Sequence, residues 1–221
     1  STAQRPVLPA VRNANGKSHR VLCEDLIPSD FPQKQLVSPK HITFKAADGQ
    51  TVYGQLFEPK NHSSAKRPAI VYVHGGPQRQ MLLGWHFMDY YSIDYALNQY
   101  LTSLGFTVLS VNYRLGIGYG FKFQKAINAG ALGASEYQDV KAAGEWLAAQ
   151  STIDAERIGI YGGSYGGFLV ALALGKDSKL FAAGVDIHGV NNRFSSANSS
   201  SRAFAPDAEL AEQAMIRSSP V

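Results

Sequence analysis

Residues 158–167 read IGIYGGSYGG, and this stretch decides how the middle of the chain folds. Its first four residues are apolar or aromatic, as in a short strand buried inside a sheet. The next residues, Gly162 to Gly166, fit the pattern G-x-S-x-G around Ser164. The apolar run that follows, YGGFLVALALG, predicts a helix ending at Gly175. The stretch therefore predicts a strand that turns into a helix at Ser164.

A strand-to-helix turn of this kind has a chemical use. The chain must reverse within about two residues, which holds the serine in a strained conformation with its hydroxyl pointing out of the sheet. The hydroxyl then lies at a helix N-terminus, where backbone N–H groups and the helix dipole favour a developing negative charge. The alternative is a flexible glycine-serine loop. The flanking buried strand and apolar helix favour a nucleophilic Ser164.

Strand and helix patterns alternate on both sides of this turn. Two alternating runs around Asp48-Gly49 indicate a β-hairpin over residues 41–59. Continuous apolar runs predict buried strands at 69–74, 106–112, 157–162 and 181–188, and helices are expected at about 92–103, 135–149 and 165–175. The predicted fold is α/β, with a mostly parallel sheet, an antiparallel N-terminal strand and helices on both faces.

A second motif, His74-Gly75-Gly76-Pro77, follows the first fully buried strand. In a serine hydrolase with this strand order, the loop after that strand supplies one N–H group to the oxyanion hole. Two glycines allow the backbone to approach a substrate closely, and Pro77 fixes the turn. A plain strand-ending turn is the alternative. Together with the turn at Ser164, the motif favours an oxyanion-binding loop.

Length and charge indicate one domain with a lead-in segment. The chain has 221 residues, 45% of them hydrophobic and 17% charged, which is ordinary for a globular domain. The net charge of +4 comes from the first 45 residues, whereas the remainder holds 14 basic and 14 acidic residues. Residues 1–40 are rich in proline and are interpreted as a linker, and residues 41–221 as the catalytic domain. A scattered excess of four basic residues is typical of a solvated linker and predicts no nucleic-acid partner.

Several other classes of site find no support in the sequence. Cys23 is the only cysteine, so no internal disulfide is possible. The longest apolar run, 168–174, is too short to cross a bilayer, and no membrane partner is predicted. No metal, nucleotide or other cofactor motif is present. No signal-peptide pattern is visible, which leaves localisation open between the cytoplasm and the periplasm.

Four stretches together carry a resemblance to a known family: VYVHGGP, VNYRLGIGYG, EYQDVKAAGEWL and RIGIYGGSYGGF. Over roughly residues 40–192 the chain resembles the catalytic domain of the prolyl oligopeptidase family of serine peptidases. Its dipeptidyl-peptidase-like and acylaminoacyl-peptidase-like members are the most similar. The resemblance implies an α/β-hydrolase fold, preceded in the family by a β-propeller. One departure is Leu115, where the family often has glycine.

The resemblance also implies roles for individual residues. Ser164 is the expected nucleophile, and the N–H groups of Tyr165 and Gly76 are the expected oxyanion donors. His74 stands where other members carry a tyrosine whose hydroxyl serves the oxyanion. The residues expected around the substrate are His74, Pro77, His188 and Phe194.

The acid and base that a serine nucleophile needs are not evident. In this fold the order is Ser, Asp, His, and after Ser164 the only histidine is His188, two residues after Asp186. Both would come from the end of one strand, which is the wrong spacing. The resemblance places the acid and base, and the last strands of the sheet, beyond Val221. We therefore expect a C-terminal segment or a second polypeptide to supply them. The alternatives are an esterase acting on small acyl esters and a non-catalytic, incomplete hydrolase.

Overall fold

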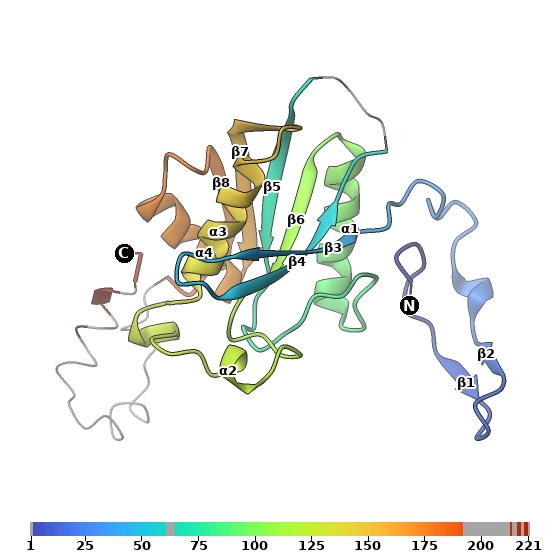
Figure 1. Cartoon of the computed structure of the whole chain (residues 1–221). Helices are drawn as coiled ribbons and strands as arrows, with labels where there is room; N and C mark the ends of the chain where they lie inside the picture. The colour runs from blue at the N-terminus through green and yellow to red at the C-terminus, as the bar shows by residue number, and fades with distance from the viewer. Residues whose placement is uncertain (1, 61–64, 192–212, 214–215, 218, 221) are drawn as a thin grey trace.

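The computed structural model describes residues 2–60, 65–191, 213, 216–217 and 219–220, and its centre is a six-stranded sheet (Figure 1). The strand order is β3-β4-β6-β5-β7-β8. The strands are β3 (Lys40–Lys45), β4 (Thr51–Phe57), β5 (Arg67–Val73), β6 (Thr107–Asn112), β7 (Ile153–Gly163) and β8 (Ala183–Ile187). The hairpin β3/β4 is antiparallel and pairs antiparallel with β6, whereas β6, β5, β7 and β8 are parallel. This confirms the predicted α/β fold with its antiparallel N-terminal edge.

Helices cover both faces of the sheet (Figure 1). Helix α1 (Asp89–Ser103) lies on one face, and α3 (Tyr137–Ala148) and α4 (Tyr165–Lys176) lie on the other. The predicted end of the last helix at Gly175 is wrong by one residue. The backbone N–H of Asp177 still donates to the carbonyl of Ala173, so the helical pattern continues through Gly175.

Alternation of side chains along the strands divides the core in two. On β5, Val71 and Val73 face the core under α3 and α4, whereas Tyr72 faces the core under α1. The first core includes Val140, Leu147, Phe168 and Leu172, and the second includes Tyr91, Tyr95 and Trp85. Because the central parts of β5, β6 and β7 are covered on both sides, buried residues follow one another there instead of alternating with exposed ones, as at 107–112 in β6 and 160–163 in β7.

The lead-in segment lies against α1 rather than apart from the sheet. It holds a small hairpin, β1 (Ala10–Arg12) with β2 (His19–Val21), and a 3-10 turn, Glu24–Leu26. The amide of Gln99 on α1 bonds both backbone groups of Val37, at 2.9 and 2.8 Å. The Tyr95 hydroxyl donates to the carbonyl of Ala3 at 2.7 Å. These contacts attach Ala3 and Val37, near the two ends of the segment, to α1, whereas the strands β1 and β2 between them are largely exposed.

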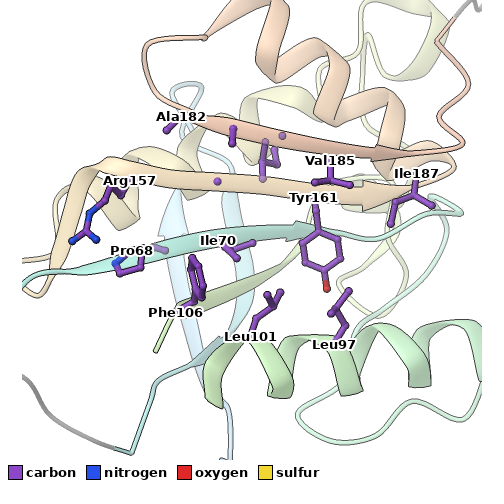
Figure 2. A pocket seen from close by; sticks show the side chains of 15 residues that line it. Pro68, Ile70, Leu97, Leu101, Phe106, Arg157, Tyr161, Ala182, Val185 and Ile187 are labelled. Carbon is purple, nitrogen blue, oxygen red and sulfur yellow. The ribbon is translucent and has the colours of Figure 1, made fainter. Parts of the chain in front are cut away.

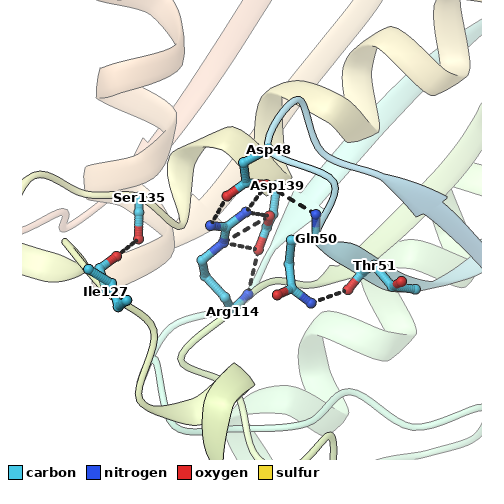
Figure 3. A network of polar contacts seen from close by, with 7 residues as sticks. All are labelled: Asp48, Gln50, Thr51, Arg114, Ile127, Ser135 and Asp139. Atoms are coloured by element: carbon cyan, nitrogen blue, oxygen red, sulfur yellow. Dashed lines mark hydrogen bonds and ion pairs between the residues drawn. The ribbon is translucent and has the colours of Figure 1, made fainter.

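A buried ion network joins the opening hairpin to the helix α3 (Figure 3). Arg114, in the loop after β6, donates from Nη2 to Asp139 at 2.6 Å and from Nη1 to Asp48 at 2.6 Å. The side chain of Arg114 is 7% exposed and that of Asp139 is 0% exposed. Burial opposes the charge on Arg114, but hydrogen bonds to Asp139 and Asp48 outweigh it and raise the Arg114 pKa. The network ties together three segments that are far apart in the sequence.

The loops between β6 and α3 carry two further short elements. They are the helix α2 (Phe121–Gln124) and a 3-10 turn, Gly130–Leu132. At the start of this region Leu115 has φ 81°, in the left-handed region that favours glycine, which is the residue the family often has there. Its backbone N–H donates to the carbonyl of Phe123 at 2.9 Å, so the chain adopts the turn despite the side chain.

Candidate active site

Ser164 occupies a sharp turn between β7 and α4. The strand ends at Gly163 and the helix begins at Tyr165. Ser164 itself has φ 56° and ψ −115°, a conformation that costs on the order of 1–3 kcal/mol. Its N–H donates to the carbonyl of Ile187 at 2.9 Å, and its carbonyl accepts the first helical bond from Phe168. The surrounding structure therefore maintains the strained turn that the G-x-S-x-G pattern predicts.

The glycines around Ser164 are required by close approach of the backbone. A Cβ atom added at Gly162 would lie 2.3 Å from the carbonyl oxygen of Val73, and one at Gly166 would lie 2.0 Å from the same atom. Neither distance is compatible with a side chain. The turn is thus pressed against the end of β5, which is where the His74–Pro77 loop begins.

We predict that Gly166→Ala destabilises the protein by about 3 kcal/mol, because the new methyl group would collide with the backbone of Val73. Gly175→Ala is the matched control on the same helix, since a Cβ there meets nothing within 4 Å. Because alanine favours helix more than glycine, the control is expected to be neutral or stabilising by up to about 1 kcal/mol. Urea unfolding measures both, and equal effects of the two substitutions would contradict the prediction.

The loop after β5 lies directly beside the serine. A Cβ atom added at Gly75 would be 3.3 Å from the Cβ of Ser164 and 2.9 Å from the carbonyl of Gly163. The next residue, Gly76, is exposed and has φ 120°. Within the part of the chain that the structure describes, no acceptor is recorded for the Gly76 N–H. Gly75, which precedes the predicted oxyanion donor Gly76, thus lies against Ser164, and the other predicted donor, Tyr165, follows Ser164 directly at the start of α4.

The side chain of Tyr165 is held away from this site. Its hydroxyl donates to Glu136, a fully buried carboxylate that also accepts the N–H of Gly130. The Tyr165 ring stacks at 6.4 Å on that of Tyr113. Because the Tyr165 hydroxyl bonds Glu136 in the interior, only the backbone of Tyr165 lies at the turn beside Ser164. An oxyanion forming above Ser164 would meet the N-terminal end of α4, where backbone N–H groups stabilise negative charge.

His74 is fully buried beside the same loop. Its ring stacks on Tyr113 at 4.4 Å, and its Nδ1 lies 2.8 Å from the carbonyl oxygen of Gly75. Its Nε2 has no hydrogen-bond partner among the described residues. Burial lowers the pKa of His74 to about 4, and the positive charge of Arg79 and of His86 acts in the same direction. A ring without exposed surface offers no contact to a substrate, so its prediction as a substrate-binding side chain gains no support here.

The lowered pKa of His74 predicts a pH-dependent stability. As pH falls below 6.5, the unfolded chain takes up the proton before the folded protein does. The contribution of His74 to stability therefore falls by about 3 kcal/mol between pH 6.5 and about 4, and this contribution is constant below that pH. Urea unfolding of the wild type and of His74→Asn measures this. The free-energy difference between the two should change across that window, and a constant difference would contradict the prediction.

Asp186 and His188 do not form a pair. The carboxylate of Asp186 accepts the N–H of Gly189 at 2.7 Å and the side-chain amide of Asn191 at 2.6 Å. His188 is exposed, and its Nε2 lies 3.4 Å from the hydroxyl of Tyr90. No hydrogen bond between Asp186 and His188, or between Ser164 and any histidine, is recorded within the described ranges. The strand-end spacing thus keeps the two side chains in separate contacts.

Sequence reasoning missed Tyr90 and Tyr91, at the start of α1. A Cβ atom added at Gly163 would lie 2.0 Å from the Tyr90 hydroxyl, and one at Gly76 would lie 3.4 Å from the Tyr91 hydroxyl. Both phenols therefore border the turn and the loop. They carry no motif, so no local signal could have placed them. Of the remaining predicted residues, Pro77 is half-buried in the loop, and Phe194 lies outside the described residues.

A large apolar groove lies elsewhere, on the α1 side of the sheet (Figure 2). Its volume is about 560 Å³. Leu97 and Leu101 of α1 face Ile70, Tyr161, Val185 and Ile187 of strands β5, β7 and β8 across it. Val185 is 59% exposed and Ile187 is 36% exposed, although both are apolar. None of the predicted site residues lines this groove, so it is separate from Ser164.

In the described residues, no three His, Cys, Asp or Glu side chains are grouped as a metal site would require. None of the helices in that part of the chain has the length and apolar character needed to span a membrane.

Known proteins resemble this chain over most of its length. The model of a family described as "Prolyl oligopeptidase family" matches residues 91–214, more than half of the chain. Mouse dipeptidyl peptidase 8 is 30% identical over 162 residues, which cover 72% of this chain and 18% of that protein. Dipeptidyl aminopeptidase BIII of Pseudoxanthomonas mexicana is 31% identical over 166 residues, which cover 72% of this chain and 23% of that protein.

A solved structure extends the similarity to the fold. Acylaminoacyl peptidase of Pyrococcus horikoshii superposes with a TM-score of 0.68 and 29% identity. The superposition covers 100% of this chain and 33% of that one. The chain thus spans about a fifth to a third of the length of these relatives.

Proposed function

Because this chain belongs to the prolyl oligopeptidase family of serine peptidases, we propose that it carries the nucleophile and oxyanion-binding groups of a peptidase acting on short peptides. The observation that carries the proposal is the turn at Ser164. A non-glycine residue is held at φ 56° at a helix N-terminus, with Gly75 packed against its Cβ. Such strain persists where the surroundings enforce it, typically at catalytic sites.

The proposed reaction proceeds through an acyl-enzyme. The Ser164 hydroxyl oxygen attacks the scissile carbonyl carbon while a base takes its proton. The carbonyl oxygen becomes an oxyanion and accepts hydrogen bonds from the N–H groups of Tyr165 and Gly76. The C–N bond then breaks, and the protonated base gives its proton to the leaving amine. Water, activated by the same base, hydrolyses the acyl ester and restores Ser164.

We propose that the base and its orienting carboxylate come from polypeptide other than the described residues. Among those residues, His19 and His41 lie in β2 and β3, His74 and His86 are buried, and His188 contacts Tyr90. None of these described histidines is seen to bond Ser164. The groove on the α1 side supports the presence of such polypeptide. Apolar surface of this extent is ordinarily covered by protein, and β8, which borders it, ends next to the turn at Ser164. A C-terminal segment or a second polypeptide would supply the base and its carboxylate and would also cover the groove.

The names of the relatives favour one class of substrate. The proteins similar to this chain are named as dipeptidyl and acylaminoacyl peptidases, which favours peptides or acylated peptides over proteins as substrates. His188 is exposed at the end of β8 beside Tyr90, where a substrate held on Ser164 would reach it. We propose His188, Pro77 and Phe194 as the residues that border the substrate.

An alkyl fluorophosphonate, which phosphonylates activated serines, tests the proposal. The chain would be treated alone and as part of the protein that its source organism makes, and the modified residue would be identified by mass spectrometry. Modification of Ser164 in the source protein and not in the isolated chain supports the proposal, including the external base. Modification in the isolated chain would refute the external base, and no modification in either sample would favour a non-catalytic protein. Turnover of small esters without detectable turnover of any peptidyl amide would favour an esterase, because a serine peptidase cleaves both.

A further inference from the structure

Two consecutive carbonyl groups at the start of the oxyanion loop are held by side chains. The carbonyl of His74 accepts a hydrogen bond from the Tyr113 hydroxyl at 2.8 Å. The carbonyl of Gly75 lies 2.8 Å from Nδ1 of the His74 ring. Because a carbonyl oxygen can only accept, Nδ1 must carry the proton. The ring is therefore the tautomer with hydrogen on Nδ1, and its Nε2, which carries no hydrogen, has no partner among the described residues.

This bond determines where the next N–H group points. The carbonyl of Gly75 and the N–H of Gly76 belong to one planar trans peptide, in which they point in opposite directions. The carbonyl is directed at the buried ring of His74, so the N–H is directed away from the interior. Gly76 is exposed, and within the described part of the chain its N–H has no recorded acceptor. Glycine at φ 120° has no conformational preference of its own that would hold this orientation.

We propose that His74 is a positioning residue, whose Nδ1–H holds the Gly75–Gly76 peptide so that the Gly76 N–H faces the carbonyl oxygen of the substrate. The inference rests on the proposed function, in which Gly76 supplies one oxyanion donor. The ring itself touches no substrate. Its stacking on Tyr113 keeps it in place, and the Tyr113 hydroxyl holds the preceding carbonyl in the same way.

Three substitutions distinguish the effect of the Nδ1–H hydrogen bond to Gly75 from the effect of the His74 ring itself. In His74→Asn the side-chain amide can place an N–H where Nδ1 lies. In His74→Gln the amide reaches the position of Nε2 instead, and His74→Leu has no donor. In the source protein we expect kcat to fall about 30-fold in the Leu and Gln variants, because the Gly76 donor is no longer fixed and an oxyanion donor is worth about 10²–10³ in kcat. His74→Asn should stay within about 3-fold of wild type, and KM should change little in all three.

A spectroscopic measurement on the wild-type chain keeps the inference testable if a variant does not fold or if no activity is found. Nitrogen-15 correlation spectra of the histidine rings distinguish the two tautomers. We expect His74 to be protonated at Nδ1 at neutral pH, and a proton on Nε2 would overturn the inference whatever the catalytic result. Equal kcat in the Asn and Leu variants would overturn it as well. Absence of any Ser164 reaction in the wild type would instead count against the proposed function, and the tautomer would still decide whether His74 holds the loop.

Discussion

Ser164→Ala is expected to abolish phosphonylation of the source protein and to lower kcat for a peptidyl amide by about 10⁴-fold or more. The reason is that the hydroxyl oxygen forms the acyl bond, and no other group at the turn can replace it. The remaining oxyanion donors account for whatever activity persists. Mass spectrometry of the labelled protein and steady-state kinetics measure the two effects.

Two comparisons make this result specific. Ser164→Ala removes one oxygen from a half-buried side chain and leaves the backbone hydrogen bonds of the turn in place. The free energy of unfolding, measured in urea, should therefore change by less than about 1 kcal/mol. Ser151→Ala, at an exposed serine in the turn before β7, should leave labelling and kcat at the wild-type level. Persistent phosphonylation of the Ser164→Ala protein would identify a different nucleophile and refute the assignment.

Asp139→Ala is expected to destabilise the protein by about 3–5 kcal/mol. Its carboxylate is 0% exposed and pairs with a guanidinium that is 7% exposed, so its loss leaves Arg114 buried without its main counter-ion. The same carboxylate accepts the backbone N–H of Arg114 at 2.7 Å, which would also lose its partner. Urea unfolding followed by circular dichroism measures the loss.

The position of Asp48 provides the control for this pair. Its side chain is 41% exposed, so Asp48→Ala removes a partner that water can partly replace, and a loss of about 1 kcal/mol is expected. In the double variant Arg114→Met, Asp139→Leu the loss should be smaller than the sum of the single losses, because neither charge remains unpaired. Equal losses in free energy of unfolding for Asp48→Ala and Asp139→Ala would show that burial of the ion pair does not determine its contribution to stability.

The sequence predicted most of the sheet because strands and turns are local features. Continuous apolar runs identified β5, β6, β7 and β8, and Asp48-Gly49 identified the hairpin. The glycines around Ser164 predicted a strained strand-to-helix turn, and Ser164 is observed there with φ 56° and ψ −115°. These predictions succeed because periodicity and glycine placement depend on residues close together in the chain.

The lead-in segment shows where such reasoning ends. Its proline content predicts a linker, but gives no indication that the backbone of Val37 bonds Gln99 or that Leu36 lies in the second core. Proline and weak periodicity describe the segment's own conformation. They do not describe the surface of α1 on which it lies, and that surface exists only after the sheet and helix have assembled.

The sequence by itself determined that Ser164 follows a strand, precedes a helix and lies among glycines, and that a His-Gly-Gly-Pro loop follows an earlier strand. Only the tertiary structure decided that Gly166 presses on Val73, that the His74 ring is buried against Gly75, and that Asp186 and His188 bind elsewhere. The first set depends on turn chemistry within a few residues. The second depends on the parallel pairing of β5 with β7 and of β7 with β8, which brings residues some 90 positions apart within van der Waals contact.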